Sequence, residues 1–118
     1  MKDVPFGFVG VALLATACGG AAIPQDQLAS SQAAIRAAEV GGAPQDPQAT
    51  LLVKKAKDQV AEAKKLIEDG DNHRAKMVLM TAESDADLAL ALAQEITARR
   101  EADDARKQVE ELRQRQGK

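Results

Sequence analysis

The 46 residues from 71 to 116 contain neither proline nor glycine, the two residues that most strongly interrupt a helix. This stretch therefore predicts one continuous helix of roughly 69 Å. Regularly spaced apolar residues occupy its first half, whereas its second half, from about Thr97 onward, is highly charged. A helix of this length in a short chain favours an elongated, all-α protein over a compact globule.

Two shorter helices precede this one, and each is bounded by start and stop signals. The first is expected at about residues 24–40, where it meets Gly41-Gly42, a pair that suits a helix end because glycine adopts the left-handed cap conformation easily. The second is expected at about residues 47–69. Its start is indicated by Asp46-Pro47, an N-cap followed by proline at the first helical position.

The three helices are expected to pack as an antiparallel hairpin with an additional N-terminal helix alongside it. Asp69-Gly70-Asp71 predicts a tight turn between the second and third helices. The second helix, of roughly 33 Å, covers only the first half of the third, so the end of the long helix projects beyond the bundle. Apolar spacing predicts the packed faces, which are Leu28, Ser31, Ile35 and Ala38 on the first helix and Val53, Ala56, Val60, Ala63 and Ile67 on the second.

The N-terminal residues indicate a secretory signal of the lipoprotein type. Residues 4–17 are apolar or small, but 14 residues are too few for a spanning helix, which needs about 20. Small residues precede Cys18, the only cysteine in the chain, so we expect cleavage before Cys18 and acylation of this residue. The predicted organisation is a signal peptide at 1–17, a lipidated tether at 18–23 and an alanine-rich helical domain at 24–118.

The alternative is an ordinary secretory signal that is cut near Ala17 and leaves Cys18 as a free thiol. An unpaired cysteine in an oxidising compartment is prone to intermolecular pairing, which favours lipidation. Gly19 stands where an aspartate would resemble an inner-membrane retention mark. We therefore expect an outer-membrane lipoprotein that faces the periplasm and carries acyl chains such as palmitate.

Removal of the signal leaves a chain without any aromatic residue. Isoleucine, leucine, valine and methionine number 20 in residues 18–118, and alanine supplies another 21. Such a composition predicts thin, closely packed helices with a shallow core. The formal net charge of −2 gives no argument for nucleic acid, which requires a basic surface.

Several segments together resemble the small alanine-rich bacterial lipoproteins described as domain of unknown function 4398. These are the small-residue motif before Cys18, the segment from Gln25 to Ile35, and the Gly-Ala-Pro break at residues 42–44. A lysine- and alanine-rich helix then leads into the segment 63–71, with Ala75 after it. The resemblance covers most of the mature chain and implies a helical lipoprotein module.

The residues indicate no enzyme and no cofactor other than the covalent lipid. His73 is the only histidine and is expected at the surface near a helix start, without a metal. Adjacent carboxylates such as Asp103-Asp104 diverge on a helix and have no sheltered pocket, so acid–base catalysis is not expected.

The expected function is that of a non-catalytic, membrane-anchored structural or adaptor protein, which binds an envelope protein or a second copy through its C-terminal helix. A 4-3-4-3 spacing of apolar residues predicts the interface, which comprises Ala98, Ala102, Ala105, Val109 and Leu112. Two alternatives stay open. One is a peptidoglycan tether through Lys118, and the other is a periplasmic holdase that uses adaptable residues such as Met77 and Met80, although core packing is the simpler role for both methionines.

Overall fold

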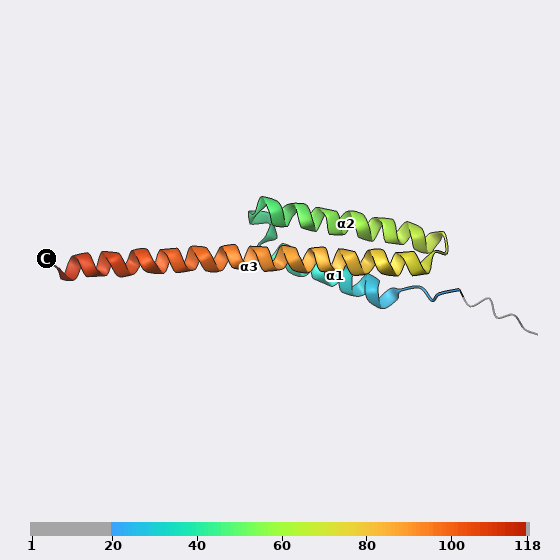
Figure 1. Ribbon diagram of the computed structural model, residues 1–118, viewed down its shortest axis with the longest axis horizontal. Coiled ribbons are helices and arrows are strands. Elements are labelled where there is room, and N and C mark those ends of the chain that lie inside the picture. Colours follow the sequence, from blue (N-terminus) through green and yellow to red (C-terminus); the bar gives the residue numbers. More distant parts are fainter. Residues whose placement is uncertain (1–19, 118) are drawn as a thin grey trace, which may run out of the picture.

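A computed structural model describes residues 20–117, and the chain folds there into three α-helices and one short 3₁₀ helix. The helices are α1 (Gln25–Val40), α2 (Pro47–Glu68) and α3 (Asn72–Gln116), and the 3₁₀ helix η1 (Ala43–Gln45) joins α1 to α2. Figure 1 shows α2 and α3 as an antiparallel hairpin with α1 along α3. The predicted all-α, elongated architecture with a projecting C-terminal helix is confirmed.

Two aspartates cap the starts of α2 and α3, and the sequence indicated the first of them, Asp46, as a cap. The Asp46 carboxylate accepts a hydrogen bond from the Ala49 backbone N–H at 2.7 Å, and Asp71 accepts one from the Arg74 N–H at 3.2 Å. Both bonds satisfy a backbone donor that has no partner within its own helix. Between the helices, Gly70 adopts a φ of 81°, which a residue with a side chain rarely adopts.

The two glycines after α1 serve different purposes. Gly42 adopts a φ of 104°, as expected for a helix end, but Gly41 has an ordinary φ of −73°. A Cβ atom at Gly41 would lie 2.2 Å from Leu90 Cδ1 and 2.9 Å from the Ala37 carbonyl oxygen. Gly41 therefore allows the end of α1 to approach α3 closely, a requirement that the sequence pattern alone did not indicate.

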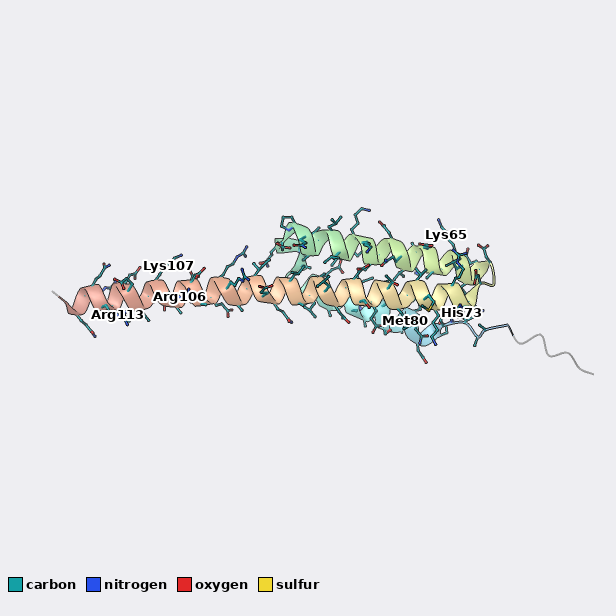
Figure 2. All side chains as sticks on the ribbon, viewed as in Figure 1. Lys65, His73, Met80, Arg106, Lys107 and Arg113 are labelled. Carbon is teal, nitrogen blue, oxygen red and sulfur yellow. The ribbon has the colours of Figure 1, made fainter. Side chains whose placement is uncertain are left out.

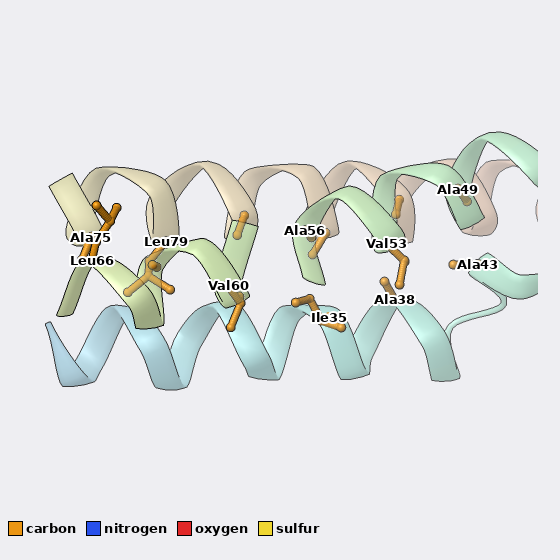
Figure 3. Packing of buried hydrophobic residues seen from close by; sticks show 14 residues of the cluster. Ile35, Ala38, Ala43, Ala49, Val53, Ala56, Val60, Leu66, Ala75 and Leu79 are labelled. Atoms are coloured by element: carbon orange, nitrogen blue, oxygen red, sulfur yellow. The ribbon is translucent and has the colours of Figure 1, made fainter. Parts of the chain in front are cut away.

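The core is a thin layer in which alanine predominates (Figure 3). Helices can approach one another closely where alanine lies between them, but each alanine buries little apolar area. Among the described residues, the buried apolar side chains larger than alanine are, apart from Pro24, only Ile35, Val53, Val60, Leu66 and Leu79. The predicted stripe on α2 is correct from Val53 to Ala63. It ends at the buried Leu66, whereas Ile67 is only half-buried.

Polar contacts between helices lie at the edges of this core. Ser30 on α1 donates a hydrogen bond to Glu83 on α3 at 2.8 Å. Lys55 on α2 pairs with Asp85 on α3 at 3.1 Å, and Lys57 pairs with Glu39 on α1. These contacts connect all three helices at surface positions, where an ion pair contributes little stability, about 0–1 kcal/mol each.

The chain enters and leaves the bundle at opposite ends. The coil before α1 lies beside the α2–α3 turn, where the Asn72 side-chain amide donates to the Ala21 carbonyl oxygen at 2.7 Å. The other end of α3 is the far tip of the molecule (Figure 1). From Thr97 to Gly117 every residue is exposed, a length of roughly 30 Å of single helix. Among residues 20–117, no helix is both long enough and apolar enough to cross a membrane.

Candidate partner-binding surface

The predicted interface lies entirely on the projecting part of α3. Ala98, Ala102, Ala105, Val109 and Leu112, called here the C-terminal seam, are all exposed, and Val109 and Leu112 keep 48% and 55% of their accessible surface. Cys18 and Lys118, the predicted lipidation site and the alternative wall-attachment site, lie outside the described residues. The seam is therefore the one predicted site whose geometry can be described.

The C-terminal seam faces away from the helical bundle. Ala93 is buried against the bundle, and Ala102 follows nine residues later. At about 100° per residue, nine residues complete two turns and a further half turn. Ala93 and Ala102 therefore lie on opposite sides of α3, so a longer α2 would not cover the seam.

The bundle-facing side of α3 changes from apolar to charged beyond the N-terminal end of α2. Positions that continue the stripe from Ala93 are charged, and each is exposed: Arg100, Asp104, Lys107 and Glu111. In Figure 2, the labelled Lys107 of this side lies on the bare part of the helix, whereas the labelled Arg106 and Arg113 flank the seam. The projecting segment thus has a charged side in line with the core and an apolar side opposite to it.

The seam continues toward the bundle along the outer face of α3. Ser84, Leu88 and Ala91 are exposed and lie within roughly 40° of the direction of Ala102. Met77 lies on the same face and is 54% exposed. The stripe is interrupted once, at Glu95, whose carboxylate pairs with Arg99 one turn further along the helix.

The expectation that Met77 and Met80 pack in the core is wrong. Met80 is 47% exposed, and Figure 2 shows its side chain at the surface of the bundle. The buried stripe of α3 instead uses smaller residues, mostly alanine, which are Ala75, Leu79, Ala82, Ala86, Ala89 and Ala93. Both methionines lie on the outer face of α3, away from this buried stripe.

Charged residues beside the seam pair mostly within their own helix. Arg106 lies 3.6 Å from Asp103, and Lys107 lies 3.4 Å from Asp104. Both pairs have i,i+3 spacing. Because all four side chains are well exposed, these pairs are easily exchanged for contacts with a partner.

A comparison with protein-family models identifies one family. The model described as "Domain of unknown function (DUF4398)" matches residues 26–113, which is most of the chain. The chain belongs to this family. No curated protein and no solved structure matches it.

The matched region defines what the DUF4398 unit contains. It begins at the start of α1 and ends at Arg113, so it includes the whole bundle and all five residues of the C-terminal seam. The projecting half of α3 is therefore part of the family's module rather than an appendage to it.

The DUF4398 bundle also has a hollow that sequence reasoning missed. It lies where α1, η1 and α2 meet, has a volume of about 230 Å³ and is open to solvent. Apolar atoms of Ala43, Pro44 and Val53 line it, and Glu39, Lys54 and Lys57 add charge. The 3₁₀ helix η1, with Ala43 buried, forms this corner. The hollow was missed because a 3₁₀ turn is hard to distinguish from a linker in sequence.

The potential metal ligands of the described part of the chain do not cluster. No group of three or more histidine, cysteine, aspartate or glutamate side chains there could hold an ion. His73 lies in the first turn of α3 and is exposed.

Proposed function

We propose that this protein is a non-catalytic lipoprotein of the bacterial envelope, anchored by a lipid on Cys18, which presents the C-terminal seam to a protein partner. The observation that carries the proposal is an exposed apolar stripe at the end of the molecule farthest from the expected anchor. An apolar stripe on a single helix gains stability when a second helix covers it.

Two features support the anchored arrangement. Cys18 follows an apolar run that ends in small residues, and two glycines follow it in the sequence. The described chain then enters beside the α2–α3 turn, at the end opposite to the tip of α3. An anchor at Cys18 would place the α2–α3 turn near the lipid and direct the seam away from it.

The charged residues of the projecting helix are better suited to partner selection than to catalysis. They lie on one exposed helix, where water surrounds each carboxylate and each ion pair. Acid–base catalysis requires groups that converge on a substrate in a sheltered site. Charges that flank an apolar seam have a different use, because they favour one partner and repel others.

Labelling and crosslinking in intact cells test the two parts of the proposal separately. Radiolabelled palmitate should be incorporated by the unaltered chain and not by Cys18→Ser, and absence of label from the unaltered chain would refute the anchor. A photo-crosslinking residue at Ala105 should capture a defined protein, whereas the same residue at Gln114, on the charged side, should not. Equal capture at both positions would refute the seam as an interface.

Exposed Met77 and Met80 favour a second candidate function, a holdase for unfolded proteins. Methionine side chains adapt to apolar surfaces of different shapes. A holdase would yield many different crosslinked proteins from positions near Met80, and their amount would increase after heat shock. The adaptor proposal expects one or a few defined products from the seam and no such increase.

A further inference from the structure

We infer that the C-terminal seam binds the same seam of a second copy of this chain, with the two α3 helices parallel. The inference deepens the proposed function, because it names the partner. It depends on the proposed anchoring only for the local concentration of the chain, and its geometry rests on residues of the described helix.

The seam has the repeat that two helices need in order to wrap around each other. Ala102 and Val109 occupy the a positions of a heptad, and Ala98, Ala105 and Leu112 occupy the d positions. All five are exposed on one face, opposite to the bundle, so α1 and α2 do not obstruct a second helix there. The alanines let two backbones approach closely, and Val109 and Leu112 supply most of the apolar area near the tip.

The charges beside the seam distinguish a parallel from an antiparallel pair. The three e positions are all arginine, namely Arg99, Arg106 and Arg113. The g positions that precede Arg106 and Arg113 are Glu101 and Gln108. This asymmetry between the two edges of the seam carries the argument, because parallel and antiparallel pairs bring different edges together.

In a parallel pair, each g residue faces the e residue of the next heptad on the other helix. Glu101 of each copy then faces Arg106 of the other, which gives two attractive contacts by symmetry, and Gln108 faces Arg113. No like charges meet across these edges of the projecting segment. The intrahelical pair between Arg106 and Asp103 is 3.6 Å long and exposed, so it does not prevent Arg106 from turning to a new partner.

In an antiparallel pair, the e edge of one helix meets the e edge of the other. Arginine then faces arginine in every register that aligns the two seams, because all three e positions carry the same charge. In one antiparallel register, Glu101 of each helix would face Arg115 of the other, which is attractive. The same register would also place Arg106 of one helix against Arg106 of the other. Like charges held together across an interface are unfavourable, and the edges therefore select the parallel pair.

Membrane anchoring would raise the probability of pairing without adding any contact. Anchored copies share one orientation, with the tip of α3 directed away from the lipid, which is the parallel arrangement. Confinement to a surface also raises the effective concentration of each copy for the other. Such help matters here because a seam of two heptads that is rich in alanine buries little area.

Cysteine crosslinking of the full-length chain in membranes tests the orientation. Ala98→Cys and Leu112→Cys should each form a disulfide-linked dimer under mild oxidation, because identical seam positions meet in a parallel pair. Cells that express two differently tagged chains, one Ala98→Cys and the other Leu112→Cys, should give no mixed dimer, since the two positions lie roughly 21 Å apart along a parallel pair. Gln114→Cys, on the opposite side of the helix, is the matched control and should give no dimer.

Charge exchange provides a second test that does not depend on folding of the bundle. Arg106→Glu places glutamate opposite Glu101 and should reduce the dimer formed by Ala98→Cys. The additional change Glu101→Arg restores opposite charges and should recover it. All three positions are exposed and lie beyond the bundle, so these variants leave the core intact.

The possible outcomes separate this inference from the proposed function. A mixed Ala98–Leu112 dimer would overturn the parallel orientation, and equal dimer yields from Ala98→Cys and Gln114→Cys would overturn the specific seam. Crosslinking of the seam to a different protein, with no dimer of this chain, would overturn the second copy as partner but leave the adaptor function standing. Absence of palmitate label from the unaltered chain would refute the anchor. It would not change the result expected from charge exchange.

Discussion

Leu79 is the largest apolar side chain that is completely buried among the described residues. Leu79→Ala would remove this side chain from a core that has few large residues to fill the space. We expect the free energy of unfolding to fall by about 2–5 kcal/mol. Urea unfolding followed by circular dichroism measures the change. Leu51→Ala on α2, where the leucine is 65% exposed, is the control and should change it by less than about 0.5 kcal/mol.

Gly70 is required for its backbone conformation and not for space. Its φ is 81°, and a Cβ atom there would have no neighbour within 4 Å. Gly70→Ala should therefore destabilise the protein by about 1–2 kcal/mol, the strain of a left-handed residue that has a side chain. Gly70→Asn should destabilise it less, because asparagine tolerates this conformation better. Equal thermal unfolding midpoints for the two variants would show that left-handed backbone strain at residue 70 is not what destabilises them.

At the scale of helices, the sequence was sufficient for type, order and approximate ends. Helix-breaking residues and caps such as Asp46 act locally, so they can be read without knowledge of the fold. The features that escaped prediction depend on contacts between helices. Gly41 is needed because Leu90 packs against it. The buried stripe of α2 ends at Leu66 rather than at Ile67, a choice between two adjacent apolar residues that spacing alone does not make.

Close packing of helices through alanine predicts that larger residues are not tolerated at the contact. Ala86 on α3 is completely buried in the core, so Ala86→Leu must force the packed helices apart or distort a side chain. We expect a loss of about 1–3 kcal/mol from overpacking. Ala61→Leu on the exposed side of α2 introduces the same side chain at a position open to solvent and should be nearly neutral. A stabilised Ala86→Leu variant would contradict the close contact.

At the scale of the whole molecule, α3 has two halves with different support. The half before Ile96 packs one face against α1 and α2, whereas residues 97–117 are exposed on every side. Backbone amides from 98 to 116 should exchange hydrogen faster than those from 75 to 93, because an isolated helical segment of this length is only marginally stable. Hydrogen exchange read by mass spectrometry measures the gradient, and uniform protection along α3 in dilute monomer would contradict it.

The candidate surface could be predicted only in part. Spacing was enough to select Ala98, Ala102, Ala105, Val109 and Leu112, because their periodicity belongs to the helix itself. Their position opposite the core could not be known until the buried face of α3 was seen. The same is true of Met77 and Met80, since an apolar side chain is buried only where a neighbouring helix covers its face.

The alanine core has a consequence for the response of this protein to temperature. Heat capacity rises on unfolding mainly because apolar surface becomes hydrated, and typical domains gain about 12–15 cal/mol/K per residue. Here each buried alanine releases little such surface, and the projecting half of α3 is already in water. Calorimetry should therefore give a smaller increment per residue. The stability curve would be correspondingly flat, so that cooling from warm to near-freezing conditions changes the folded fraction very little.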